Sequence, residues 1–226
     1  MTWWLVNFSR RGPARYLSHL DTSRVVQRTF ARAGIPIALS HGMRPKPRLS
    51  LPLPLPVGAA GADEVAVVEV AEGVTATTEA LKALRAASPP GFEPLGIVDA
   101  GERHPRPHPR AAEYACALDG DAGAIVAAVE RYDDAEDAIR ERVSPKGTRR
   151  LDLKDYAGDV TATPVEGGAR LDFTIRHRSD GAARPQELID LIAEWAEVDP
   201  VMRGLERLRI AWDDWPPDLT AGGGRS

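Results

Sequence analysis

The chain has 226 residues, of which 43% are hydrophobic and 27% charged, a composition typical of globular proteins. No apolar run approaches the roughly 20 residues that a membrane-spanning helix needs, and residues 1–6 lack the basic and apolar regions of a signal peptide. A single cysteine, Cys116, excludes an internal disulfide and a cysteine-ligated iron–sulfur cluster. We therefore expect a cytoplasmic protein without a membrane segment.

The net charge of −4 conceals an asymmetry along the chain. Residues 1–50 contain nine Lys or Arg and one acid, Asp21, whereas the other 176 residues contain 20 basic and 32 acidic side chains. The first segment therefore carries a charge of +8 and the remainder −12. Such a split favours a local contact between the first 50 residues and an anionic partner.

The first half of the chain alternates strand and helix patterns. Residues 3–9 predict a strand, and Ser18 predicts a helix N-cap, with Asp21 as its acidic partner three residues later. The helix is expected to end near Ala33, because Gly34 is a typical residue just past a helix end. Further elements are expected as a basic loop over 41–48, an extended segment over 49–57, a strand over 64–71, a helix over 75–87 and a strand over 92–99.

Leucine and proline alternate over residues 51–56. Each proline lacks a backbone donor, so this segment cannot form a central strand. It predicts either an edge strand or a polyproline II segment, with the leucines facing the core.

The second half repeats the pattern loosely. Asp119 or Asp121 caps an expected helix that runs to about Tyr132, and Pro185 begins another. Strands are expected over 112–118, 159–166, 169–177 and 203–213, with a turn at Gly167-Gly168, while 133–158 has no clear pattern. We predict an α+β fold of two tandem ferredoxin-like (βαββαβ) units. The expected boundaries are 1–99 for the first unit, 100–110 for a linker, 111–214 for the second unit and 215–226 for a disordered tail.

Two groups of cations are candidates for binding phosphates. The predicted first helix places Arg24, Arg28 and Arg32 on one stripe. The proline-rich loop adds Arg44, Lys46 and Arg48, and its prolines reduce the entropy lost on binding. A solvated helix face is the alternative for the stripe. Lys146, Arg149 and Arg150 form a second, weaker candidate.

Few residues indicate catalysis. His19 and His41 are compatible with the acid–base pair of a metal-independent ribonuclease, although His19 at a helix start can equally cap or pack. His104 and His108 cannot share a helical face, because prolines separate them, so we expect no metal site and no cofactor in this chain. Cys116 falls in a predicted strand and is expected in the core. Phosphate-binding glycine loops and nucleophile elbows are missing from the sequence.

Starting at Tyr16-Leu-Ser-His-Leu-Asp21, with Arg24 after it, the chain resembles the radical-SAM-associated (radical-SAM-linked) protein family. That family is an uncharacterised domain fused to, or encoded beside, cobalamin-binding radical-SAM proteins. The resemblance continues through Arg32-Ala-Gly-Ile-Pro36, Ser40-His-Gly42, Pro45-Lys-Pro-Arg-Leu-Ser50, Leu53-Pro-Leu-Pro-Val-Gly58 with Glu64, and Leu151-Asp-Leu-Lys-Asp-Tyr156. It implies a role beside a radical-SAM enzyme. The chain cannot be that enzyme, because it lacks the three cysteines of the cluster loop and the cobalamin motif.

These observations lead to three hypotheses. The first is a non-catalytic accessory protein that presents an RNA, tRNA- or ribosome-related, to a radical-SAM partner. In it the six cations contact phosphates, and a motif core shapes the surface; the core comprises Ser18, His19, Asp21, Ser40, His41 and Gly42. Six contacts to a single strand predict a log–log salt slope of about −4. The alternatives are the ribonuclease and a pure protein–protein adaptor. Whether Ser18, His19 and Asp21 are functional or form a structural link between helix and loop stays open.

Overall fold

The computed structural model describes residues 1–144 and 147–213, apart from the side chain of Ser144. The described residues form two compact units, one of Met1–Pro109 together with Trp212 and Asp213, and the other of residues 110–211. Both mix helices and strands, which confirms an α+β protein. None of the described helices is long and apolar enough to cross a membrane. The tail expected over 215–226 lies outside the described residues.

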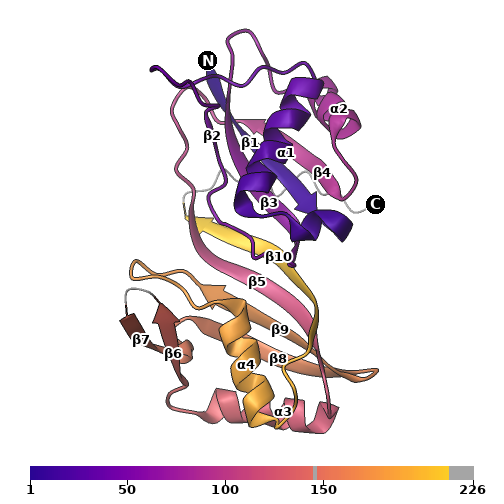
Figure 1. Ribbon diagram of the computed structural model, residues 1–226, viewed down its shortest axis with the longest axis vertical. Coiled ribbons are helices and arrows are strands. Elements are labelled where there is room, and N and C mark those ends of the chain that lie inside the picture. Colours follow the sequence, from indigo (N-terminus) through magenta and orange to yellow (C-terminus); the bar gives the residue numbers. More distant parts are fainter. Residues whose placement is uncertain (145–146, 214–226) are drawn as a thin grey trace. The chain divides into compact units, whose positions relative to one another are not determined.

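The first unit pairs antiparallel strands and adds two α-helices (Figure 1). Its strand order is β4-β1-β3, with β2 paired to β3. Its elements are β1 (Thr2–Arg10), the 3₁₀ helix η1 (Gly12–Tyr16), α1 (His19–Arg32), β2 (Leu49–Ser50), β3 (Ala60–Val70), α2 (Thr78–Ala87) and β4 (Phe92–Asp99). The strands expected over 3–9, 64–71 and 92–99 are therefore confirmed, while α2 begins three residues later than predicted because Thr77 caps it.

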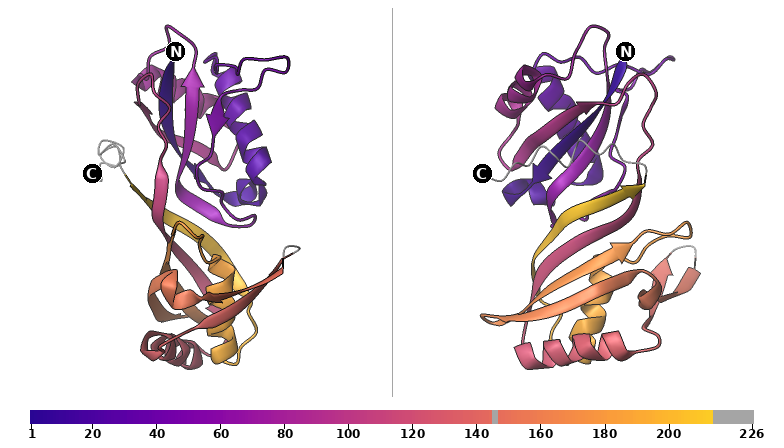
Figure 2. Two further views of the ribbon diagram at one scale, coloured as in Figure 1. Left: turned by 90° about the vertical axis from the view of Figure 1, so that its left-hand side faces the viewer. Right: turned by 180° about the vertical axis from the view of Figure 1, so that it is seen from behind.

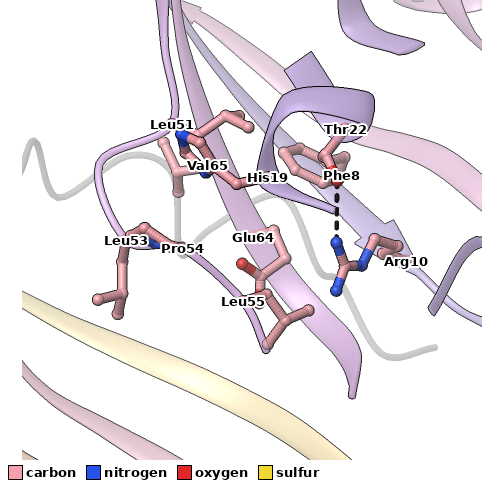
Figure 3. Close-up of a pocket in the computed structure, with 10 residues that line it drawn as sticks. All are labelled: Phe8, Arg10, His19, Thr22, Leu51, Leu53, Pro54, Leu55, Glu64 and Val65. Carbon is pink, nitrogen blue, oxygen red and sulfur yellow. Dashed lines mark hydrogen bonds between the residues drawn. The ribbon is translucent and has the colours of Figure 1, made fainter. Parts of the chain in front are cut away.

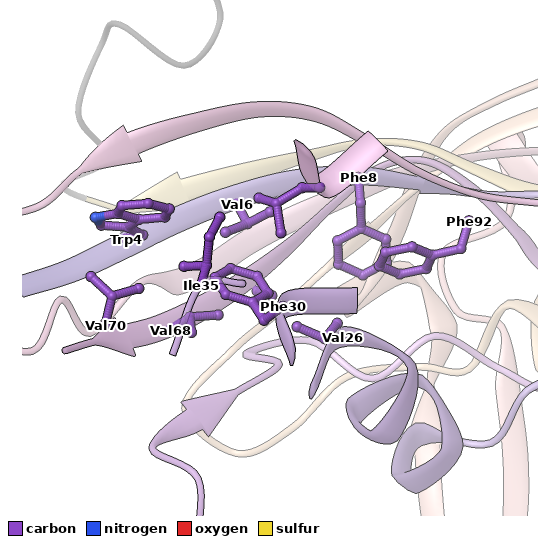
Figure 4. Close-up of a cluster of buried hydrophobic side chains, with 11 residues drawn as sticks. Trp4, Val6, Phe8, Val26, Phe30, Ile35, Val68, Val70 and Phe92 are labelled. Carbon is purple, nitrogen blue, oxygen red and sulfur yellow. The ribbon is translucent and has the colours of Figure 1, made fainter. Parts of the chain in front are cut away.

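Helices α1 and α2 contribute side chains to one core with these strands. Figure 4 shows Val26 and Phe30 of α1 within this core. The core there combines alternate residues of β1 with Val26 and Phe30 of α1 and Leu84 of α2. Phe8 stacks on Phe92 with ring centroids 4.6 Å apart. Trp4, Val6 and Phe8 therefore give the helix side of β1 an apolar surface, as a buried central strand requires.

The opposite face of β1 is also buried. Trp3, Leu5 and Val67 form a second cluster with Ala100. The segment after β4 continues alongside β1, because Trp3 N donates to Gly101 O at 2.8 Å and Ala100 N donates to Trp3 O at 2.7 Å. His104 then meets the Trp3 ring edge-on at 4.2 Å. Part of the predicted linker thus serves the first unit's own core.

The Leu–Pro segment forms almost no strand. Pairing with β3 is limited to Leu49 and Ser50, and the residues that follow have irregular backbone. The prolines explain this, since none of them can donate to a strand ladder. Leu55 is buried, whereas Leu51 and Leu53 are half-buried. The extended element expected over 49–57 is therefore confirmed as a strand for two residues only.

The second unit has strand order β10-β5-β9-β8 and a separate hairpin, β6-β7. Helix α3 contacts β8, β9 and α4, and both helices lie on one side of this sheet (Figure 2). The elements are β5 (His108–Asp119), α3 (Ala122–Asp134), β6 (Ile139–Ser144), β7 (Gly147–Asp152), the 3₁₀ helix η2 (Leu153–Asp155), β8 (Ala157–Val165), β9 (Gly168–Arg176), α4 (Pro185–Trp195) and β10 (Met202–Asp213). Asp121 is the cap of α3, and the alternation of Leu171, Phe173 and Ile175 on the buried face of β9 is confirmed.

The segment Leu151–Tyr156, which contributed to the family resemblance, forms a structural corner. Asp152 accepts hydrogen bonds from Ala138 N and Lys154 N, both at 3.0 Å. The Lys154 ammonium donates to the carbonyls of Tyr132 and Asp133 at the end of α3. These contacts join α3 to η2, so the motif has a structural role in the second unit.

A half-buried histidine is expected to make the second unit sensitive to pH. Burial lowers the pKa of His177, and the nearby Arg207 adds to this effect. Nε2 of His177 has no hydrogen-bond partner among the residues that the structure describes. Because the unfolded chain takes up a proton near pH 6.5 while the folded chain resists it, stability is complete above that pH and falls as the pH decreases. We expect His177→Gln to reduce this loss, measured by urea unfolding between pH 7.5 and 5. An unchanged pH profile would contradict the assignment to His177.

Candidate nucleic-acid interface

The start of α1 is held by its own side chains. Ser18 caps the helix, its hydroxyl oxygen accepting from Asp21 N at 3.1 Å and its hydroxyl donating to the Asp21 carboxylate at 2.7 Å. Arg24 donates to the other carboxylate oxygen at 3.0 Å. The Ser18 hydroxyl, and then Arg24, lower the pKa of Asp21. Ser18 and Asp21 therefore organise the helix start, as a capping pair does.

The predicted arginine stripe lies on the outside of α1. Arg24, Arg28 and Arg32 are all exposed, while the buried face of the helix consists of Thr22, Val26, Thr29 and Phe30. Arg24 is partly neutralised by Asp21. Within the described part of the chain, Arg28 and Arg32 have no ion-pair partner, so their charges face solvent.

The basic loop is closed at its base by Ser40. Ser40 N donates to Lys46 O at 2.8 Å, and Lys46 N donates to the Ser40 hydroxyl at 3.0 Å. His41, Gly42, Met43 and Arg44 form the exposed tip, and Gly42 has a positive φ of 126°. Ser40 and Gly42 thus shape the loop, which presents the side chains of Arg44 and Lys46 to solvent.

Arg48 occupies a different environment from the other five cations. Its Nε lies 2.5 Å from Oε2 of Glu69, whose side chain is only 7% exposed. Its guanidinium also lies over the Trp3 ring, 5.1 Å from the centroid. Arg48 therefore neutralises a buried carboxylate in the first unit, and we leave it out of the proposed phosphate contacts.

Arg10 is a buried charged residue, and the sequence pattern does not predict its burial. It is 1% exposed, at the end of β1. Nη1 donates to Leu17 O at 3.1 Å and Thr22 Oγ1 at 2.9 Å, and Nη2 donates to Pro56 O at 3.1 Å and Ala59 O at 3.3 Å. One guanidinium thus joins β1, the start of α1 and the end of the Leu–Pro segment. The planar five-donor group makes this possible.

A small cavity lies beside Arg10 (Figure 3). Its walls include Arg10, Thr22, His19 and Glu64, together with leucines of the Leu–Pro segment. Glu64 is 4% exposed, and a Cβ at Gly61 would lie 2.5 Å from its Oε1, so a glycine there leaves space for the carboxylate. The cavity volume is about 10 Å³, the space of one water molecule. It is too small for a substrate.

The structure does not place the two histidines on one site. His19 is the first residue of α1 and lines the cavity, whereas His41 lies on the exposed loop tip and is not among the lining residues. No group of three or more metal-ligating side chains occurs in residues 1–144 and 147–213. Cys116 is buried in β5, and burial raises the pKa of its thiol to about 12. That thiol stays protonated at neutral pH.

In the second basic candidate, Arg149 is paired. Arg149 donates to Asp180 Oδ2 at 3.2 Å and to the Tyr156 hydroxyl at 3.1 Å. Arg150 is exposed on β7, and Lys146 lies outside the described residues. The first unit therefore offers the stronger cationic surface.

Comparison with known families identifies the chain at the level of its family. The model of a family described as "Uncharacterized protein conserved in bacteria (DUF2344)" matches residues 4–185. The chain belongs to the DUF2344 family. The DUF2344 match includes α1, the basic loop and the Leu151–Tyr156 corner, so it extends from the first unit into the second and ends at the start of α4.

No curated protein matches the sequence of this DUF2344 chain. Among solved structures, a crystal structure of an unknown protein from Galdieria sulphuraria matches with 14% sequence identity. The match covers 92% of this chain and 99% of that chain, with a TM-score of 0.27. A TM-score of that size supports no structural conclusion.

Proposed function

We propose that the chain is a non-catalytic accessory protein that binds RNA through its first unit. The observation that carries the proposal is a set of exposed cations on α1 and on the basic loop, residues 41–48, that follows it in the chain. Four of them have no ion-pair partner among the described residues; they are Arg28, Arg32, Arg44 and Lys46. Phosphate contacts from arginine and lysine supply most of the affinity for nucleic acid. Arg24 adds a fifth cation, which Asp21 partly neutralises.

The proposed partner is a radical-SAM enzyme, for which this chain presents a tRNA- or ribosome-related RNA. Support comes from the motifs that resemble radical-SAM-associated proteins, from Tyr16–Asp21 through Leu151–Tyr156. The chain has one cysteine, so the chemistry belongs to the partner in this proposal. We also propose that each unit is ferredoxin-like. The strand orders β4-β1-β3, with β2 beside β3, and β10-β5-β9-β8 support this fold.

A salt titration tests the RNA proposal. Four phosphate contacts to a single strand predict a slope of about −3 for the logarithm of the binding constant against the logarithm of the salt concentration. Replacing Arg28 and Arg32 together with alanine is expected to weaken binding to every RNA sequence and to reduce the slope to about −1.5, because two contacts are lost. Fluorescence anisotropy with a labelled single strand measures both quantities.

The matched control is Arg103→Ala with Arg106→Ala. These two arginines are exposed in the segment after β4 and change the net charge equally. We expect this control to retain the wild-type slope, which separates a local contact from a general effect of charge. A slope near zero for the wild type, or equal slopes for the two double variants, would contradict the proposal. RNA cleavage without metal that disappears on replacing His19 and His41 would favour the ribonuclease instead.

The partner is tested by affinity capture of the tagged chain from its own lysate, washed with or without ribonuclease. Retention of a radical-SAM protein that is lost with ribonuclease, together with one enriched RNA class, is the expected result. Retention that resists ribonuclease would favour the adaptor, which docks by protein contacts.

A further inference from the structure

We propose that Tyr16 is a stacking platform for an unpaired base, so that the RNA bound by the first unit is single-stranded. This inference rests on the proposed RNA binding and adds the class of RNA. Base stacking on an aromatic ring is a general mode of single-strand recognition, and it is closed to bases that are stacked within a duplex.

The exposure of Tyr16 is the first observation. Tyr16 is 63% exposed, whereas every other Phe, Trp or Tyr in the described part of the chain is buried or half-buried. A large ring left in water at a fixed position loses apolar burial that the core would supply. A partner that covers the ring restores that burial.

The backbone that presents the ring is held on both sides. Leu17 N donates to Ala14 O at 3.1 Å, and Gly58 N donates to Arg15 O at 2.8 Å. The buried Arg10 donates to Leu17 O at 3.1 Å. Three hydrogen bonds therefore fix residues 15–17 between η1 and α1. A fixed platform costs less entropy on binding than a mobile one.

One cation lies against the ring. The Arg15 guanidinium lies 5.0 Å from the Tyr16 ring centroid, and Tyr16 is still 63% exposed, so ring surface remains for a base. Tyr16 also precedes the helix that carries Arg24, Arg28 and Arg32. An aromatic ring at the start of a cationic stripe matches the arrangement of single-strand binding surfaces, where the backbone contacts cations and bases contact rings.

The test compares single-stranded and duplex RNA of equal length. Tyr16→Ser is expected to weaken single-strand binding by about 5- to 150-fold, the effect of losing one stacked base, with the salt slope unchanged. Tyr16→Phe is expected to bind as the wild type, since the ring is kept. A strand containing 2-aminopurine should lose fluorescence on binding wild type and Tyr16→Phe but not Tyr16→Ser. Leu20→Ala is the matched control, because Leu20 is 58% exposed at the start of α1 and has no ring.

The outcomes separate this inference from the proposed function. If Tyr16→Ser binds the single strand as well as wild type while Arg28→Ala with Arg32→Ala weakens it, stacking is overturned and RNA binding stands. Equal loss for Leu20→Ala and Tyr16→Ser, or preference of the wild type for duplex, overturns stacking as well. Absence of binding to either RNA by the wild type overturns both.

Discussion

Replacing Arg10 with methionine is expected to lower the free energy of unfolding by about 3–5 kcal/mol, the usual cost of breaking a buried charged network. Methionine fits the space of the arginine stem but donates no hydrogen bond. The carbonyls of Leu17, Pro56 and Ala59 would then lose a donor in a buried or half-buried setting. Each carbonyl that is left without a donor lowers the free energy of unfolding by about 1–3 kcal/mol. Urea unfolding followed by circular dichroism measures the change.

Two further variants test whether the hydrogen bonds of Arg10 explain this loss of stability. Arg10→Lys keeps the charge but is also expected to destabilise, since an ammonium group cannot reach both the start of α1 and the end of the Leu–Pro segment. Arg209→Met is the control, because that side chain is 66% exposed and pairs with Glu113 at the surface. Its expected effect is below about 1 kcal/mol. A loss below about 1 kcal/mol for Arg10→Met would show that the network contributes little.

Gly91→Ala is expected to destabilise the first unit by about 2–5 kcal/mol. The residue has φ of 81°, a conformation that costs an L side chain about 1–2 kcal/mol. A Cβ there would also lie 2.3 Å from the carbonyl oxygen of Arg11. This contact forces the backbone apart, with a strain of about 1–3 kcal/mol. The hydrogen bond from Arg11 N to Gly91 O at 2.8 Å would be disturbed as well.

Gly73→Ala separates the two costs. Gly73 has nearly the same φ, 83°, but no atom lies within 4 Å of the position its Cβ would take. Its loss of stability is therefore expected to contain only the conformational part, about 1–2 kcal/mol. Equal losses in the two variants would refute the role of the Arg11 contact. Denaturant midpoints at constant m-value provide the comparison.

Short-range signals predicted much of the secondary structure. The start of α1 at Ser18 and its end before Gly34 were predictable because capping contacts join residues three or four positions apart. The alternation of Leu171, Phe173 and Ile175 revealed the buried face of β9, since side chains of a strand alternate between faces. The hairpin β6-β7 was missed. Its stabilising contacts, such as Arg142 with Glu187 at 2.6 Å, join residues 45 positions apart.

The candidate surface also has a part that the sequence predicts and a part that it does not. Arg28 and Arg32 were predictable as exposed cations, because the helical repeat places them opposite the buried Val26 and Phe30. The environment of Arg48 was not predictable, as Glu69 lies 21 positions away and meets it only after β2 pairs with β3.

By itself, the sequence determined the basic N-terminal segment, the helix ends and the two-fold repetition of strand and helix, because charge, capping and periodicity are local properties of the chain. The tertiary structure decided that Arg10 is buried and Tyr16 exposed. Arg10 is buried where its guanidinium meets the carbonyls of Pro56 and Ala59, and the backbone beside Tyr16 is held by the hydrogen bond from Gly58 N to Arg15 O; these partners lie more than 40 positions away. Burial depends on which distant segments meet, and that choice belongs to the packing of the whole unit.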